Sequence, residues 1–296
     1  MKLQFKTMLV TVLALLFAVS ASAGMEKTRK GAVYVYDSGS SFGKIHTYRA
    51  PFKAAANTST IIELSDRLII VDFQLAEPFA REFRAYADSL GKKIDRAYLS
   101  HEHPDHWMGS IAFQDVKTYA LPEVMAFVKA HGDKIIKKKG KPGKIPNFAG
   151  VVKPGTETIG GVSFKFSQYK EGESHNTLVI ALPELKTVLL QDLLFSNTHF
   201  YLGNNTFDGW INSLREMVTE YKDYSWFIPG HGNPRTSKVV FAENIAYLEE
   251  VKKAFAGADG DAKKIEQQLL KTFTDYKCGF FLSFGLPHAL NQAQKR

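Results

Sequence analysis

The sequence predicts an α/β fold in which helices pack on the face of a β-sheet. Residues 67–72 form an apolar run typical of a strand, and residues 77–90 have helical periodicity that Gly91 ends. Residues 95–99 then form a second apolar run, typical of a buried strand. This order of strand, helix and strand indicates helices packed against a sheet.

Further elements are expected on both sides of this unit. Strands are predicted at 31–36, 58–64, 117–121, 162–169, 177–182, 187–190 and 226–228, and helices at 122–139, 207–221, 237–255 and 262–273. The strands at 58–64 and 67–72 are expected to form a hairpin around Ser65-Asp66. Residues 278–296 show no pattern that predicts a role.

The N-terminus has the features of a secretory signal peptide. Residues 1–23 combine a basic start, an apolar run too short to span a bilayer, and the small residues Ala21 and Ala23 before Gly24. We therefore expect residues 1–23 to be removed and the protein to be exported to the periplasm or the medium, without stable membrane insertion. A retained membrane anchor is the alternative. Residues 24–296 are expected to form one domain, with a core at about 58–235 and C-terminal helices in 237–296.

The chain is mildly basic and has one thiol. Its formal charge is +8, and loss of Lys2 and Lys6 with the leader would leave about +6. A mild excess of positive charge that is spread along the chain is more typical of a protein that attracts small anionic substrates than of one with a nucleic-acid-binding surface. No nucleic acid partner is therefore expected. The densest basic run, 134–144, is interpreted as a solvated loop, with a basic lip over an anionic substrate as the alternative. Because Cys278 is the only cysteine, cysteine ligands are not expected.

The most informative stretch is residues 101–106, which follow the strand at 95–99. Four of its six side chains are potential metal ligands: His101, His103, Asp105 and His106. Imidazole and carboxylate groups are donors that Zn²⁺ accepts, and a catalytic zinc keeps one coordination position open. Pro104 favours an extended backbone at His103, which is needed because positions i and i+2 diverge on a helix. The remaining ligands must come from elsewhere in the chain.

Three further candidate ligands lie beside predicted strands. His175 precedes the strand at 177–182, Asp192 follows the one at 187–190, and His231 follows the one at 226–228. Loops at one edge of a sheet bring together residues that are distant in sequence. Each signal is weak alone, since a lone histidine is usually an ordinary polar residue and an aspartate at a strand end is usually a turn residue. The glycines around His231 allow close approach of the backbone.

Taken together, these positions resemble the metallo-β-lactamase superfamily. The family pattern of His-x-His-x-Asp-His, a single His, an Asp and a final His is matched in order by His101, His103, Asp105, His106, His175, Asp192 and His231. The resemblance covers about residues 59–234 and implies a four-layer αββα sandwich. It also implies two Zn²⁺ per chain, one held by His101, His103 and His175 and the other by Asp105, His106 and His231, with Asp192 as a bridge. Asp72 matches an acidic position of the family and is expected to support the ligands.

The resemblance implies metal-assisted hydrolysis. Two metals about 3.5–4 Å apart lower the pKa of a shared water towards 7 and clamp the attacked and leaving oxygens. A metal-bound hydroxide is then the expected nucleophile, and Asp105 and Asp192 are the expected catalytic residues that hold and orient the water. The sequence has no Gly-x-Ser-x-Gly elbow that would supply a serine nucleophile.

The expected substrate is a small molecule with an ester, thioester, lactone or amide bond. By the resemblance, β-lactamases usually lack an aspartate at the position of Asp192, whereas glyoxalase II-type thioesterases, lactonases and phosphodiesterases keep it. Asp192 thus favours a general hydrolase, while export favours a β-lactamase proper, and both remain open. A non-hydrolytic di-iron redox protein is a further alternative, although those members carry glutamate at the position of His103. A purely structural zinc site is the last alternative, although such sites are usually rich in cysteine.

Large side chains near the ligands are candidates for the pocket wall. The candidates are Trp107, Met108 and the loop 195–208, with Tyr201 and Trp210 as aromatic residues. Burial in the core is an equal alternative for the two tryptophans. His199 is expected either to lie at the surface or to donate to a substrate oxygen.

Overall fold

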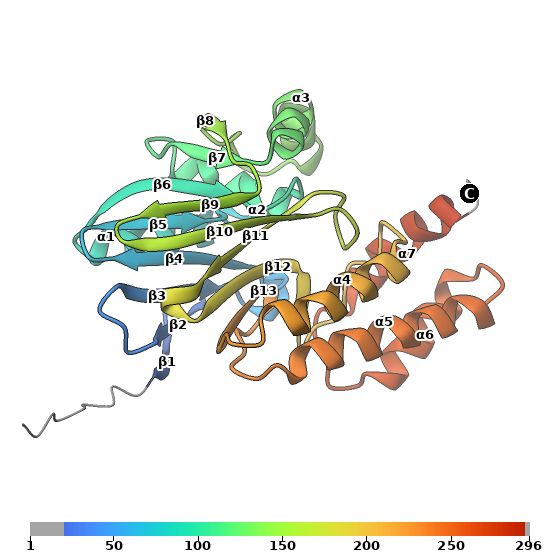
Figure 1. Ribbon diagram of the computed structural model, residues 1–296. Helices are drawn as coiled ribbons and strands as arrows, with labels where there is room; N and C mark the ends of the chain where they lie inside the picture. Colours follow the sequence, from blue (N-terminus) through green and yellow to red (C-terminus); the bar gives the residue numbers. More distant parts are fainter. Residues whose placement is uncertain (1–20, 294–296) are drawn as a thin grey trace, which may run out of the picture.

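The computed structural model describes residues 21–293, which form two facing β-sheets covered by helices (Figure 1). The first sheet has eight strands in sequence order: β1 (Ser22–Lys27), β2 (Ala32–Asp37), β3 (Gly43–Arg49), β4 (Thr58–Leu64), β5 (Arg67–Val71), β6 (Lys93–Leu99), β7 (Thr118–Ala120) and β8 (Phe148–Val151). The second sheet has five, in the order β13 (Trp226–Gly232), β12 (Thr187–Ser196), β11 (Thr177–Leu182), β10 (Val162–Tyr169) and β9 (Gly155–Ile159).

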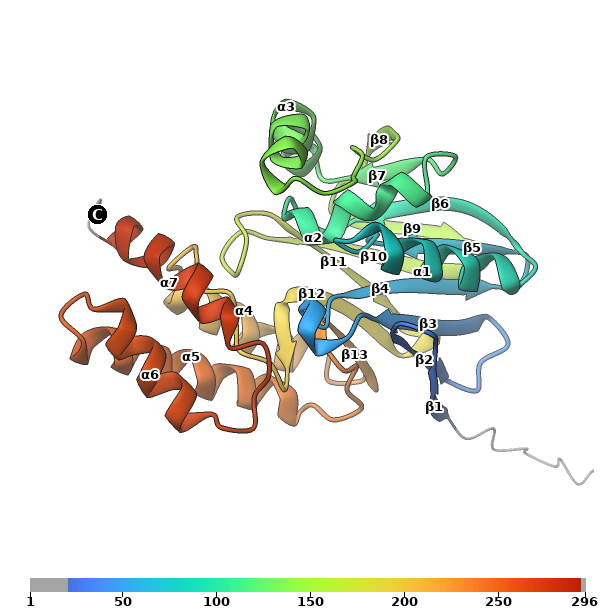
Figure 2. The ribbon, with the colours of Figure 1, turned by 180° about the vertical axis from the view of Figure 1, so that it is seen from behind.

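Helices lie outside both sheets and extend beyond them (Figure 2). They are α1 (Glu77–Ser89), α2 (Pro104–Trp107), α3 (Pro122–Lys139), α4 (Phe207–Glu220), α5 (Val239–Gly257), α6 (Ala262–Thr272) and α7 (Phe280–Ala293). Helices α1 and α3 lie with the first sheet, and α4 and α5 lie with the second. This arrangement is the predicted αββα sandwich, extended by α6 and α7.

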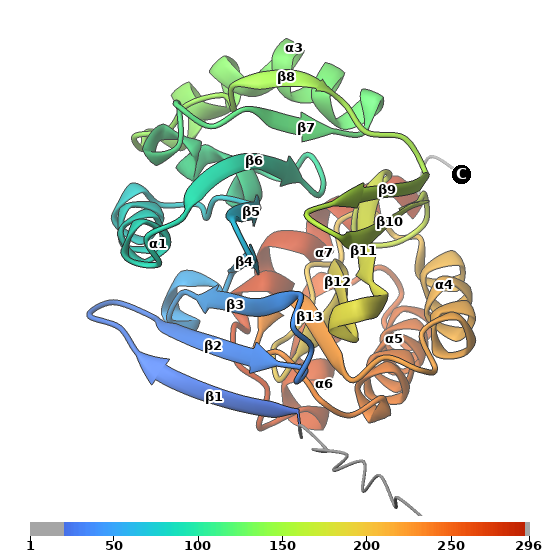
Figure 3. The ribbon, with the colours of Figure 1, turned by 60° about the vertical axis from the view of Figure 1, so that its left-hand side comes forward.

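The two sheets form separate layers with helices outside them (Figure 3). Alternation of side chains along the strands produces these layers. In β5, Leu68 and Ile70 belong to the core under α1, whereas Ile69 and Val71 belong to the core between the sheets. In β12, Val188 likewise packs under α4 and α5, and Leu189 packs between the sheets. Because successive strand residues point to opposite faces, a strand covered on both faces is apolar at nearly every position. The short apolar runs of the sequence are therefore central strands.

Several of the elements that sequence patterns missed have a weak or unusual pattern, although β3 was also missed and is largely buried. Strand β1 is exposed at all six positions, β9 is exposed at four of five, and β8 has no buried position, so burial does not mark these three strands. Helix α7 is apolar along most of its length and contains Pro287, so its sequence does not show the pattern of an amphipathic helix. Strand β12 continues to Ser196, six residues beyond its predicted end. Helix α7 and the added part of β12 both contribute to the functional site.

The predicted leader lies almost entirely outside the described residues. Of residues 1–23, only the last three are described, and Ser22 and Ala23 begin β1. Signal cleavage and export thus stay predictions. None of the helices within residues 21–293 is both long and apolar enough to cross a bilayer.

Candidate metal centre

The first ligands follow β6 as predicted. The backbone at His103 is extended, and Pro104 begins the short helix α2, so His101 and His103 precede the helix while Asp105 and His106 lie on it. This change from extended to helical backbone lets ligands two residues apart approach one centre. His101 and His106 are completely buried.

The two sheets touch where the site forms. Thr58 at the start of β4 donates a hydrogen bond from Oγ1 to the carbonyl oxygen of Pro229 in β13, at 2.6 Å. Beside the ligand loop, the backbone N–H of Leu178 in β11 donates to the carbonyl oxygen of Ser100, at 2.8 Å. Residues from both sheets therefore reach a common edge.

Asp192 reaches the site from inside β12, at an irregularity of the strand. The register of β12 against β13 shifts on both sides of Gln191, whose φ is +49°. Asp192 then lies against Gly230, where an added Cβ would overlap the Asp192 carboxylate. Glycine is required at this close approach, and His231 follows it directly in β13.

The structure does not bring His175 to the other predicted ligands. The His175 side chain is exposed and lies outside the groups of side chains that could hold a metal. Glu173, two residues earlier in the same loop, is instead buried, with 3% of its surface exposed. Its carbonyl oxygen accepts a hydrogen bond from Asn204 Nδ2, and its Oε2 lies 2.8 Å from His103 Nδ1. The short loop before β11 turns Glu173 inward and His175 outward.

The structure brings together seven possible ligands in two neighbouring groups. The first is His101, His103, Glu173 and Asp192, and the second is Asp105, His106 and His231. Within each group the ligand atoms lie within 4.8 Å of one another. Asp192 connects the groups, because its Oδ2 is 3.6 Å from His101 Nε2 and its Oδ1 is 3.2 Å from His106 Nε2. Asp192 Oδ2 is also 3.2 Å from His231 Nε2.

Three histidines are oriented by contacts at their outer nitrogens. His106 Nδ1 lies 2.8 Å from Asp72 Oδ2, and His231 Nδ1 lies 2.8 Å from the carbonyl oxygen of Ala55. His101 Nδ1 lies 2.9 Å from Ser100 Oγ. Such contacts fix the ring and leave Nε2 directed at the site, as in many metal-binding histidines.

Asp72 holds this support together. It is completely buried, and it accepts hydrogen bonds from the backbone N–H of Ser100 at 2.8 Å and from Ser100 Oγ at 2.7 Å. Gln191 Nε2 also donates to Asp72. The expected supporting role of Asp72 agrees with these contacts, which link β5, the ligand loop and the irregular part of β12.

Electrostatic attraction dominates the two groups. Burial disfavours protonation of His231, but Asp192 and Asp105 raise its pKa to about 10. Burial likewise acts against His103, whose pKa the Glu173 carboxylate raises to about 9. Burial disfavours the charged form of Asp192, yet His106 and His231 hold its pKa well below its usual range. The site thus stabilises positive charge among fixed carboxylates.

The donor atoms of the two groups lack partners that a bound metal ion would supply. The buried atoms His101 Nε2 and Asp192 Oδ1 have no hydrogen-bond partner among the described residues. A buried polar atom without a partner is costly, and both atoms are aimed between the ligands. The set offers only nitrogen and oxygen donors, which suit Zn²⁺ and harder divalent cations.

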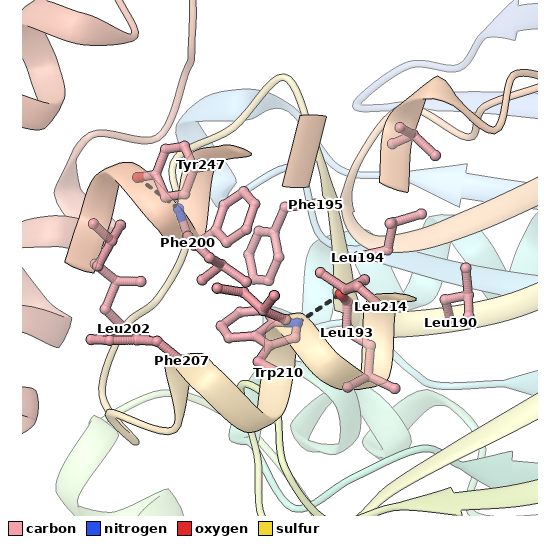
Figure 4. Close-up of a cluster of buried hydrophobic side chains, with 14 of the residues drawn as sticks. Leu190, Leu193, Leu194, Phe195, Phe200, Leu202, Phe207, Trp210, Leu214 and Tyr247 are labelled. Atoms are coloured by element: carbon pink, nitrogen blue, oxygen red, sulfur yellow. Dashed lines mark hydrogen bonds between the residues drawn. The ribbon is translucent and has the colours of Figure 1, made fainter. Parts of the chain in front are cut away.

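A cavity of about 430 Å³ opens over the ligands. Tyr201 lines it, as expected, but Trp107, Met108 and Trp210 are core residues. Figure 4 shows Trp210 among Phe195, Phe200 and Leu214, with its indole N–H donating to the carbonyl oxygen of Leu193.

The expectation for His199 was wrong, whereas burial in the core, the alternative given for the two tryptophans, is confirmed. His199 is neither at the surface nor in the cavity, because it is buried with Nδ1 2.9 Å from the Tyr247 hydroxyl. The wall that the tryptophans do not supply comes from α7 and from the end of α3.

The fold and the ligand groups together define a metal-dependent α/β hydrolase. The family model of the metallo-β-lactamase superfamily matches residues 54–231. The chain belongs to the metallo-β-lactamase superfamily, whose members are metal-dependent hydrolases. This assignment confirms the resemblance that the sequence pattern indicated.

Solved structures agree at the level of the fold. A metallo-β-lactamase from Pontibacter korlensis superimposes with a TM-score of 0.55 at 14% identity, covering 77% of this chain and 99% of its own. The metallo-β-lactamase FIM-1 from Pseudomonas aeruginosa, solved in a mono-zinc form, gives a TM-score of 0.51 at 17% identity, covering 77% and 95%. VMB-1 gives 0.53 at 17% identity, covering 78% and 98%. No curated protein was found to match the chain.

Proposed function

We propose that this protein is an exported, dinuclear zinc-dependent hydrolase that cleaves an ester, thioester, lactone or amide bond in a small molecule. The observation that carries the proposal is the position of Asp192. Its Oδ2 lies 3.6 Å from His101 Nε2 of the first group, and its Oδ1 lies 3.2 Å from His106 Nε2 of the second. A carboxylate between two ligand groups suits a shared bridge between two cations.

The first ion would be held by His101, His103 and Glu173, and the second by Asp105, His106 and His231, with Asp192 between them. When bound, two zinc ions lower the pKa of water and polarise the carbonyl or phosphoryl oxygen of a substrate.

The residues of the chain have distinct tasks in this reaction. Asp192 is almost fully buried, with its side chain 2% exposed, and holds the two ligand groups at a fixed separation. The side chain of Asp105 is 20% exposed and lines the cavity. Its Oδ2 faces His231 Nε2 at 3.3 Å, which leaves Oδ1 available to accept a proton or to orient a water beside the reacting bond. Asp72 and the Ala55 carbonyl keep the histidine rings in place.

The second candidate function is that of a β-lactamase proper. It is favoured by the fold shared with the metallo-β-lactamases above and by the predicted signal peptide. Asp192 favours the general hydrolase, because by family resemblance β-lactamases usually lack an aspartate there.

A substrate panel distinguishes these candidates. The purified mature protein, residues 24–296, is assayed with a thioester, a lactone, bis-p-nitrophenyl phosphate and nitrocefin, with and without chelator. We expect hydrolysis of the thioester or lactone that chelation abolishes and zinc restores. Turnover of nitrocefin alone would support the β-lactamase, and oxygen consumption by an iron-loaded protein without any hydrolysis would contradict both. The variant Asp192→Ala is expected to lose activity, whereas the exposed control Asp208→Ala is expected to keep it.

A further inference from the structure

The cavity over the metal centre has walls of two different chemistries. Its base is formed by the ligands His103, Asp105, Glu173, Asp192 and His231. One wall is aromatic and belongs to α7, and another is basic and belongs to the end of α3. At about 430 Å³ the cavity has the size of a small-molecule site.

The aromatic wall leaves large apolar side chains in water. Phe284 is 66% exposed and Phe280 is 38% exposed, and their rings lie 6.3 Å apart on α7. Phe281 joins this wall to the metal centre, because its ring centroid is 4.9 Å from that of His231. Exposed apolar surface beside a polar site marks a place where a ligand is bound.

The basic wall consists of Lys138 and Lys139. Both are exposed in the last turn of α3, and neither forms an ion pair with any residue of the described range 21–293. The helix C-terminus favours lysine in this turn, but that effect does not require a cation to face the cavity. Lys134 and Lys137 are also exposed on α3 and do not line it.

The base and the two walls of the cavity therefore differ in chemistry. A substrate that enters this cavity meets the metal ligands at the base, positive charge at one wall and apolar surface at the other.

We propose that the substrate is an amphiphilic anion. Its apolar chain lies along Phe280 and Phe284, its anionic group pairs with Lys138 and Lys139, and the bond to be cleaved lies over the metal ligands between them. This inference rests on the proposed hydrolase function for the cleavage step, but the binding site itself is formed by residues that are not metal ligands.

The test measures binding without turnover. Octane-1-sulfonate, methanesulfonate and 1-octanol are titrated into the zinc-loaded protein by calorimetry, below the critical micelle concentration. We expect octane-1-sulfonate to bind most tightly, because only this compound has both an apolar chain for the aromatic wall and an anionic group for the basic wall. Reversing the charge of both lysines, K138E/K139E, is expected to weaken its binding at least about ten-fold, as for loss of a charged hydrogen bond. The matched control K134E/K137E makes the same change in net charge and is expected to alter binding less than about two-fold.

A second variant tests the aromatic wall. F280S/F284S is expected to weaken the binding of octane-1-sulfonate several-fold and to leave the affinity for methanesulfonate unchanged. The variant replaces exposed side chains, so the core is not disturbed. Equal weakening by K138E/K139E and K134E/K137E would overturn the inference, as would equal affinity for octane-1-sulfonate and 1-octanol. Binding to anionic phospholipid vesicles without any binding of monomeric octane-1-sulfonate would also overturn it.

A kinetic comparison separates this inference from the proposed function. With an anionic and a neutral ester of the same chain length, K138E/K139E is expected to raise the KM of the anionic ester selectively and to leave kcat nearly unchanged. If no ester, thioester, lactone or amide is hydrolysed while octane-1-sulfonate binding still depends on Lys138 and Lys139, the hydrolase proposal fails and the binding site stands.

Discussion

At the scale of single residues, Glu173 is a buried carboxylate whose Oε2 lies 2.8 Å from His103 Nδ1. His175 and Glu173 lie two residues apart in one loop, and both can bind a metal. Sequence order alone favoured His175, because the family pattern has a histidine there. Only the path of the loop shows that Glu173 is turned inward and buried against His103.

The role of Glu173 is tested by comparing Glu173→Gln with His175→Ala. The first removes the charge of a proposed ligand, and we expect the affinity for the first zinc ion to fall at least about ten- to hundred-fold. The second changes an exposed side chain and is expected to have no measurable effect. Competition with a coloured chelator measures both affinities. A loss of zinc in His175→Ala with none in Glu173→Gln would restore the original ligand assignment.

The buried His199 predicts a pH dependence of stability. Burial lowers its pKa to about 4 in the folded protein, against 6.5 in the unfolded chain. Between these values the unfolded chain binds more protons, so stability is retained above pH 6.5 and falls as the pH drops towards 4. The full effect is roughly 3 kcal/mol at 1.36 kcal/mol per pKa unit.

Urea unfolding at pH 7 and pH 5 of the wild type and His199→Gln checks this expectation. Because glutamine does not titrate, the variant is expected to lose less stability between the two pH values than the wild type does. Equal losses would show that His199 is not the titrating group.

At the scale of elements, irregular strand geometry determines the site. Strand β12 was expected to end at Leu190, because the apolar run stops before Gln191. The chain in fact makes an irregular step at Gln191 and continues pairing with β13, which places Asp192 within the strand and against Gly230. A periodic pattern predicts regular strands, and it does not predict where a register shift directs a side chain inward.

The contact between Gly230 and Asp192 gives a prediction at this scale. In Gly230→Ala the new methyl group would displace the Asp192 carboxylate, so we expect both zinc affinities to fall and thermal stability to decrease. Gly257→Ala is the control, because a Cβ at Gly257 meets nothing within 4 Å and its backbone is helical. Calorimetric titration with zinc and thermal unfolding measure the two effects. Unchanged zinc binding in Gly230→Ala would contradict the proposed close packing.

Helix α7 shows why part of the pocket could not be predicted. Its residues are apolar on nearly all sides, and Pro287 interrupts the expected pattern, so neither helix nor function is evident from the sequence. In the structure one side packs against α6 through Leu282 and Leu286, while Phe280 and Phe284 remain exposed at the cavity. The tryptophans, by contrast, were plausible pocket residues only because of their size, and the core accommodates them.

At the scale of the whole molecule, the sequence predicted the architecture better than the details. Apolar runs and helical periodicity located the central strands β4, β5, β6, β10 and β11 and the helices α1 and α3 to α6. These elements are buried on regular faces, so their patterns are strong. The ligand positions His101, His103, Asp105, His106, Asp192 and His231 converge as the family pattern implied. What escaped prediction depends on loop paths and on contacts between distant segments.

We propose that segments from both sheets hold two cations, with Asp192 shared between them. Zinc content and affinity of the mature protein, measured by mass spectrometry after dialysis and by calorimetric titration, test it most directly. We expect two zinc ions per chain and weaker binding of both in Asp192→Ala. A single bound ion whose affinity is the same in the wild type and in Asp192→Ala would contradict it.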